Sequence, residues 1–209
     1  MKLSVSILSI KNNLKNNIDI IDKSKVDFIH LDIMDSIFVN NKTWDFNNVL
    51  ELVKDATKPL DVHLMVKDVK RYIDDYKKLS PSYITFHLEA VENHLDIIDY
   101  IKNHNIKVGM SIKPNTPLSK LTPYLKYLDL VLVMSVEPGM GGQTFIDSTE
   151  NKLKELKDIR NKNNYNFQIE VDGGINDVTI NKCKDADIVV VGSFITNSNN
   201  YIEQINKIM

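Results

Sequence analysis

Short apolar runs alternate with longer amphipathic segments along the whole chain, and this alternation predicts its elements. In the longer segments apolar residues recur three or four positions apart, as at Ile97, Ile98 and Ile101, which is typical of helices with one buried face. The short runs are rich in aliphatic residues and predict strands at Lys2–Leu8, Phe28–Ile33, Leu60–Met65, Tyr83–His87, Lys107–Ile112, Leu128–Met134, Phe167–Val171 and Asp187–Val191. The predicted helices are Asn12–Asp22, Asn47–Asp55, Asp68–Lys78, Glu92–Asn103, Leu118–Lys126, Ser148–Asn163, Asp177–Lys184 and Asn200–Ile208, with Asp68 and Ser148 as N-caps.

Eight strands that are each followed by a helix favour a (β/α)8 TIM barrel, an α/β fold built here as a single domain over residues 1–209. A doubly wound open sheet alternates in the same way and is the competing architecture. However, no G-x-G-x-x-G motif follows the first strand, and no linker or low-complexity segment divides the chain. The closed barrel is therefore the prediction.

Composition narrows the classes of partner and compartment. The formal net charge of −2 and the scattered lysines give no basis for binding nucleic acid or an anionic membrane. No run of about 18 apolar residues predicts a membrane span, and the chain enters its first strand without a leader-like stretch. The single cysteine, Cys183, cannot form an intrachain disulfide and has no histidine near it in sequence, which argues against a nucleophilic role. We expect a reduced, cytoplasmic protein.

Polar side chains recur two positions apart at the ends of several predicted strands. In Phe28–Asp35, strand alternation turns His30, Asp32 and Met34 to one face and the aliphatic residues to the other. An isolated pair of this kind would be read as a surface strand, but the third strand reads Asp61-Val62-His63-Leu64-Met65, again with polar residues two apart, and the seventh ends Glu170-Val171-Asp172. The two histidines with Asp32 and Asp172 offer ligand types for zinc, iron or manganese, so these four residues are a candidate metal site.

The glycines are concentrated at the same end of the predicted barrel. Of 7 in the chain, only Gly109 lies outside the segments that follow strands six, seven and eight. Glycine lets the backbone approach a ligand, and barrels often bind phosphate in the loops after strands seven and eight. The only arginines, Arg71 and Arg160, lie elsewhere. We therefore expect backbone N–H groups to bind a phosphate there.

Together these segments resemble the ribulose-phosphate 3-epimerase family. The resemblance is carried, in order and spacing, by Ser6–Ser9, His30–Asp35, Asp61–Met65, Met134–Gln143, Val171–Gly174 and Val190–Ser193. It implies that His30, Asp32, His63 and Asp172 hold one divalent ion (zinc, iron, manganese or cobalt) and that Asp32 and Asp172 are the catalytic acid/base pair. It also implies a substrate-binding set of Ser6, His63, Gly139, Met140, Gly141, Gly142, Asp172, Gly173, Gly174, Gly192 and Ser193.

The chain departs from the family pattern at a few positions. Val5 and Asn40 replace prolines, Ser36-Ile37 replaces a glycine-histidine pair, and Met140 replaces a phenylalanine. None of these positions is a proposed ligand of the metal. Asp35 is expected to be a loop or capping residue, and the loop from Glu137 to Phe145 is long enough to act as a lid.

The resemblance implies interconversion of D-ribulose 5-phosphate and D-xylulose 5-phosphate, a step of the pentose phosphate pathway, by two-base proton transfer at C3 through a metal-stabilised enediolate. The partner would be a phosphorylated ketose, with no nucleic acid and no membrane, and a homo-oligomer stays open. An allulose 6-phosphate 3-epimerase is the nearest alternative. A non-catalytic sugar-phosphate-binding barrel would leave the carboxylates and histidines without a role, and a metal-dependent hydrolase would not need two opposed carboxylates.

Overall fold

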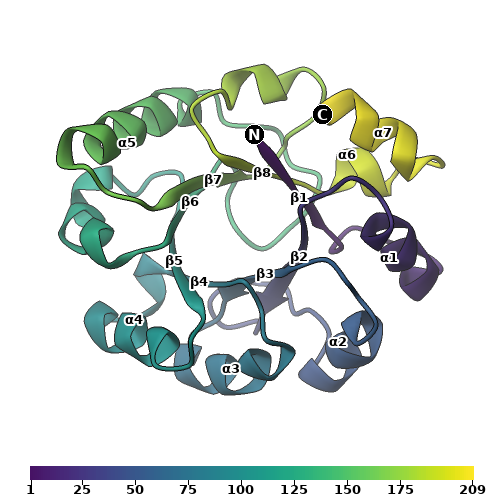
Figure 1. The fold of residues 1–209 in the computed structure, drawn as a ribbon, viewed down its shortest axis with the longest axis horizontal. Coiled ribbons are helices and arrows are strands. Elements are labelled where there is room, and N and C mark those ends of the chain that lie inside the picture. Colours follow the sequence, from purple (N-terminus) through teal and green to yellow (C-terminus); the bar gives the residue numbers. More distant parts are fainter.

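The eight strands close into a parallel barrel whose order around the ring follows the chain (Figure 1). The structure is a computed structural model that describes residues 1–209. The strands are β1 (Lys2–Ser6), β2 (Phe28–Met34), β3 (Leu60–Met65), β4 (Tyr83–His87), β5 (Lys107–Ile112), β6 (Leu130–Met134), β7 (Gln168–Asp172) and β8 (Ile188–Val191). The predicted TIM barrel is confirmed and the open sheet is wrong, because β1 pairs with both β2 and β8.

Helices form the outer ring around these strands (Figure 1). They are α1 (Leu14–Asp22), α2 (Phe46–Val53), α3 (Val69–Tyr76), α4 (His94–Lys102), α5 (Thr149–Asn163), α6 (Ser193–Thr196) and α7 (Tyr201–Ile208). Two predicted α-helices are instead 3₁₀ segments, namely Leu118–Lys120 with Thr122–Tyr127, and Thr179–Lys182. In the first of these, Pro123 lies inside the predicted helix and lacks an N–H group, which interrupts regular α-helical bonding. The sequence did not predict the short α6.

The two faces of each strand separate the core from the barrel interior. On β2, Ile29, Leu31 and Ile33 belong to the large apolar core that lies between strands and helices. Inside the barrel, Phe28 and Tyr83 meet edge to face near the amino ends of their strands, with ring centroids 5.9 Å apart. They belong to a separate apolar cluster, which runs along β6 from Leu130 to Met134. The polar residues of the interior lie further along the strands.

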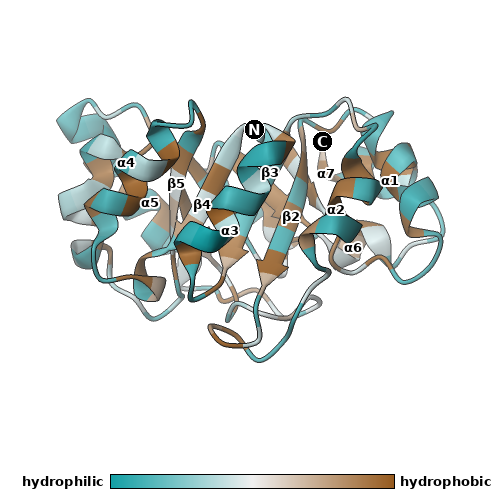
Figure 2. Cartoon of the chain, turned by 90° about the horizontal axis from the view of Figure 1, so that it is seen from below, coloured by the Kyte–Doolittle hydropathy of each residue, from teal (hydrophilic) through white to brown (hydrophobic).

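All strands point to one end of the barrel, from which the longest loops project (Figure 2). The parallel register aligns β2 with β3, so that His30 lies beside Asp61, Asp32 beside His63 and Met34 beside Met65. On the other side of the barrel, Met134 of β6 lies beside Asp172 of β7. The polar side chains of several strands therefore lie at similar positions along the barrel axis, near the carboxyl ends of the strands.

Local capping partly follows the sequence predictions. The Asp68 carboxylate accepts a hydrogen bond from the Arg71 N–H at 3.4 Å and caps α3 as predicted, whereas Ser148 makes no such bond. Asp35 is a loop-capping residue, since its carboxylate accepts bonds from the N–H groups of Ile37, Phe38 and Lys67.

None of the helices is both long and apolar enough to cross a membrane.

Candidate active site

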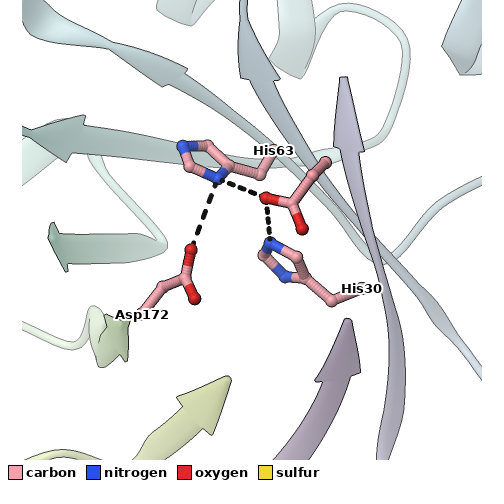
Figure 3. A group of neighbouring side chains, drawn as sticks. His30, His63 and Asp172 are labelled. Carbon is pink, nitrogen blue, oxygen red and sulfur yellow. Dashed lines mark ion pairs between the residues drawn. The ribbon is translucent and has the colours of Figure 1, made fainter. Parts of the chain in front are cut away.

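The two histidines and two carboxylates that were predicted to form a site converge at the mouth of the barrel. His30, Asp32, His63 and Asp172 each offer a ligand atom, and these atoms all lie within 4.8 Å of one another. His63 lies between the two sides of the group, with Nδ1 3.4 Å from Asp32 Oδ1 and 3.9 Å from Asp172 Oδ2 (Figure 3). His30 Nε2 lies 3.4 Å from the same Asp32 oxygen. Residues from three strands, far apart in the sequence, thus surround one small volume.

The imidazole nitrogens that face this volume have no hydrogen-bond partner. His30 Nε2 and His63 Nδ1 are both buried and unpaired. The other nitrogen of each ring is engaged, because His30 Nδ1 lies 2.7 Å from Asp61 Oδ2 and His63 Nε2 lies 2.9 Å from His87 Nε2. A buried polar atom without a partner is costly, and a cation at the centre of the group would satisfy both nitrogens. The donor set fits a divalent zinc, iron, manganese or cobalt ion.

The two carboxylates of the group differ in their protonation. Burial raises the pKa of Asp32, but the adjacent His30 and His63 outweigh it and hold that pKa well below its usual range. Burial, together with the negative charge of Asp32, raises the pKa of Asp172 to about 7. Near neutrality Asp32 is therefore ionised, while Asp172 is present in both its protonated and its ionised form. Such a split between two neighbouring carboxyl groups is what an acid/base pair requires.

A second buried polar group lies deeper in the barrel and was missed in the sequence. Asp61 and Glu170 precede the ligands His63 and Asp172 by two positions and point to the same interior. The Ser4 hydroxyl donates to Asp61 Oδ2 at 3.0 Å, on the oxygen that also contacts His30. Burial and the charge of Asp61 raise the pKa of Glu170 well above its usual range, which favours the protonated form of Glu170. The two-residue spacing was visible in the sequence, but its partners could be identified only from the fold.

A cavity opens directly above the four-residue group. All of the residues predicted to bind substrate except His63 line it, and three further methionines and Asp32 complete its walls: Ser6, Gly139, Met140, Gly141, Gly142, Asp172, Gly173, Gly174, Gly192 and Ser193, with Asp32, Met34, Met65 and Met134. His30 and His63 do not line this cavity, and both are fully buried. The structure thus places the predicted glycine-rich loops around one cavity and the histidines below it.

Two of these glycines show why glycine is needed. Gly174 has φ +63°, and a side chain there would meet the backbone nitrogen of Phe145 at 2.4 Å. Gly192 has room for a methyl group, since a Cβ atom would meet only Ser6, at 3.4 Å or more. The fold therefore requires glycine at position 174. At position 192 the fold would accept a side chain, and its absence leaves more space in the cavity beside the backbone.

Two loops meet over one side of this cavity. The Asn41 amide, in the loop after β2, donates to the Gly139 carbonyl in the loop after β6 at 2.7 Å. Each loop carries a strongly exposed apolar side chain, Ile37 at 75% and Met140 at 61%. This arrangement fits the expectation that the loop after β6 acts as a lid.

Cys183 has no part in the site. It is fully buried beside the 3₁₀ segment Thr179–Lys182, and burial raises its pKa to about 12. The thiol is therefore neither accessible nor ionised near neutrality, which excludes the nucleophilic role.

Comparison with known proteins agrees with this geometry. Residues 2–196 match the family model described as the ribulose-phosphate 3 epimerase family. The chain is 37% identical over 212 aligned positions to a ribulose-phosphate 3-epimerase of Buchnera aphidicola subsp. Acyrthosiphon pisum, covering 98% of this chain and 91% of the relative. It is 38% identical to the ribulose-phosphate 3-epimerase of Escherichia coli K12, covering 87% of this chain and 82% of the relative.

The solved structures that resemble the chain share its fold at low sequence identity. KGPDC from Streptococcus mutans superimposes with a TM-score of 0.71 at 14% identity, covering 99% of this chain and 94% of that one. A 3-hexulose-6-phosphate synthase superimposes with a TM-score of 0.69 at 16% identity, covering 100% of this chain and 98% of that one. At this identity, the likeness shows the barrel fold alone.

Proposed function

This chain belongs to the ribulose-phosphate 3-epimerase family, a family of isomerase-class enzymes, and from that premise we propose that it interconverts D-ribulose 5-phosphate and D-xylulose 5-phosphate. The observation that carries the proposal is the pairing of Asp32 and Asp172 at one cavity, where the pKa of Asp32 lies well below its usual range and that of Asp172 is raised to about 7. Inversion at carbon three needs a base on one face of the substrate and an acid on the other. Asp32 on β2 and Asp172 on β7 approach the cavity from different sides of the ring.

The reaction depends on the acidity of the hydrogen on carbon three. The neighbouring C2 ketone takes up the charge when that hydrogen leaves, which gives an enediolate. The ionised Asp32 removes the proton from one epimer, and the protonated Asp172 returns a proton to the opposite face. In the reverse direction the two residues exchange these roles. The Ser6 hydroxyl donates a 2.6 Å hydrogen bond to Asp32 Oδ2 and holds this carboxylate toward the cavity.

In this proposal, His30, Asp32, His63 and Asp172 hold one divalent metal ion. The support is their mutual approach within 4.8 Å and the two unpaired, buried imidazole nitrogens. The chemistry that such an ion supplies when bound is Lewis-acid stabilisation of negative charge on neighbouring substrate oxygens. His30 lies between Asp32 and Asp61, and burial lowers its pKa while both carboxylates raise it well above the usual range. Metal binding would therefore displace a proton from this ring.

The glycine-rich loops after β6, β7 and β8 would bind the phosphate through backbone N–H groups. Gly141, Gly142, Gly174, Gly192 and Ser193 all line the cavity. Met34, Met65 and Met134 would border the sugar carbons with weakly polar sulfur. The cytoplasm is the proposed location, as the lone, reduced cysteine led us to expect.

A purified-protein assay tests this function and its alternatives together. We expect rapid conversion of D-ribulose 5-phosphate to D-xylulose 5-phosphate, slower turnover of allulose 6-phosphate and no release of inorganic phosphate from either. Preferred turnover of allulose 6-phosphate would shift the substrate to a hexose phosphate. Phosphate release would indicate a hydrolase, and binding without turnover would indicate a non-catalytic barrel.

A further inference from the structure

We propose that His87 and Glu89 are positioning residues that fix the tautomer of His63, so that its Nδ1 presents a lone pair to the metal site. This inference rests on the metal part of the proposed function. Neither residue lines the cavity, and neither belongs to the group of four candidate ligands. They lie behind that group, at the end of β4 and in the 3₁₀ turn Leu88–Ala90 that follows it.

The contact between the two histidines requires one ring to donate and the other to accept. His63 Nε2 and His87 Nε2 lie 2.9 Å apart, and both side chains are fully buried. Because burial disfavours the charged form of an imidazole, each of these fully buried rings is taken in its neutral form, which carries one proton on one of its two nitrogens. Two neutral imidazoles in contact have only two consistent arrangements, and they differ in which ring donates.

Glu89 selects between these two arrangements. Its Oε2 lies 3.4 Å from His87 Nδ1, and its Oε1 accepts from the Lys113 N–H at 2.9 Å and from the Thr116 hydroxyl. Burial raises the pKa of Glu89, but these hydrogen bonds outweigh it and lower that pKa to about 2. An ionised carboxylate can only accept, so the proton of His87 must be on Nδ1.

The rest of the chain of bonds follows from this one proton. With Nδ1 protonated, His87 Nε2 has a free lone pair and accepts the Nε2–H of His63. His63 Nδ1 is then unprotonated, and it is this atom that faces Asp32 at 3.4 Å and Asp172 at 3.9 Å. A metal-binding imidazole whose far N–H is held in this way is oriented and made more basic. Glu89 thus determines, from behind two imidazole rings, which nitrogen of His63 is available to a cation.

Glu89→Gln tests this arrangement because the amide has only one acceptor oxygen. The Lys113 N–H requires that oxygen on its own side, which turns the amide NH2 group toward His87. His87 must then accept at Nδ1 and donate at Nε2, and His63 must move its proton to Nδ1. The matched control is Glu92→Gln, which removes the same charge from an exposed position on the same segment.

Two measurements report on the proposal without using activity. Long-range ¹⁵N–¹H spectra of the metal-free protein should show His63 as the Nε2–H tautomer and His87 as the Nδ1–H tautomer, with both reversed in Glu89→Gln. Titration with Mn²⁺, followed by the paramagnetic resonance of the free ion, should show binding about 10- to 100-fold weaker in Glu89→Gln and unchanged in Glu92→Gln. If the Glu89→Gln variant does not fold, the tautomers of His63 and His87 in the wild-type spectrum still test the proposal.

Each outcome separates this inference from the proposed function. A wild-type His63 protonated at Nδ1 overturns the inference, as does a Glu89→Gln variant that keeps both tautomers and the wild-type Mn²⁺ affinity. A wild-type protein that binds no Mn²⁺ overturns the metal part of the proposed function and the positioning role with it. If the wild type binds Mn²⁺ and Glu89→Gln binds it equally well, only the positioning role fails.

Discussion

His63 Nδ1 and Asp32 Oδ1 lie 3.4 Å apart, and the nitrogen, although buried, has no hydrogen-bond partner. The same oxygen lies 3.4 Å from His30 Nε2, the other unpaired imidazole nitrogen of the group. Two buried imidazole nitrogens thus face the same carboxylate oxygen, and neither has a hydrogen-bond partner. Burying them in this state costs free energy that a divalent cation would offset.

We therefore expect the purified protein to contain one divalent metal ion per chain. Removing the ion with a strong chelator should abolish epimerase activity, and adding back manganese, zinc, iron or cobalt should restore it. Elemental analysis alongside the assay gives the stoichiometry. Fully active protein with no bound metal would refute this part of the account.

Gly192→Ala tests whether backbone approach at the cavity wall matters for the phosphate. The added Cβ would meet only Ser6 at ordinary contact distance, so the fold and the metal content should be unchanged. The methyl group should raise KM for the phosphorylated ketose at least several-fold, because it stands where the loop backbone faces the cavity. A variant with wild-type KM would show that the phosphate binds elsewhere.

Ser36→Gly should stabilise the protein. Ser36 is exposed and has φ +62°, in the left-handed region that a residue with a side chain occupies at a cost of about 1 kcal/mol. Thermal or urea unfolding should therefore show a gain of about that size. Ser82→Gly is the matched control, since φ at Ser82 is not positive and glycine there should destabilise the chain. If both variants lose stability, no strain is stored at Ser36.

Glu89 should make the metal-free protein sensitive to mild acid. Its pKa falls from 4.5 in the unfolded chain to about 2 in the folded protein, despite the opposing effect of burial. The stabilisation is complete above the unfolded pKa and is lost as the pH falls from about 4.5 toward 2. Between pH 5 and 3 the wild type should lose on the order of 1–2 kcal/mol of unfolding free energy that Glu89→Gln does not lose. Urea unfolding in the presence of a chelator measures this difference, and parallel losses in both proteins would contradict it.

The sequence predicted the barrel well because short aliphatic strands and longer amphipathic segments alternate eight times along the chain, and the fold keeps this order. The predicted bounds of β3, β4 and β5 agree with the structure, and the ends that differ do so by one or two residues. The predicted ligands converge because the parallel strands all have their carboxyl ends at the same end of the barrel. The α-helices expected at Leu118–Lys126 and Asp177–Lys184 were wrong, since apolar spacing alone does not distinguish an α-helix from short 3₁₀ turns.

The supporting residues of the site could not be predicted in the same way. His87 is the last residue of β4, as Asp172 is of β7, but its contact with His63 depends on the register of β3 against β4. Glu89 lies in a turn and becomes significant only through its bonds to His87, Lys113 and Thr116. The roles of Asp32 and Asp172 in catalysis came from the resemblance, and they stay a prediction until they are measured.

The central claim is that each aspartate serves one face of carbon three, and isotope exchange at that carbon tests it. In Asp172→Asn, the epimer that gives its proton to Asp32 should still exchange its C3 hydrogen with deuterated water. Conversion to the other epimer should fall by roughly a hundred- to ten-thousand-fold, the usual contribution of a general acid or base. Asp32→Asn should show the opposite pattern, with exchange retained only by the other epimer.

Both residues are also proposed ligands, so the metal content of each variant must be measured before its kinetics are interpreted. The decisive measurement is therefore C3 deuterium exchange against epimerisation in metal-loaded Asp172→Asn. The account predicts exchange from one epimer with little conversion. Metal-loaded Asp172→Asn that epimerises at near the wild-type rate would contradict it.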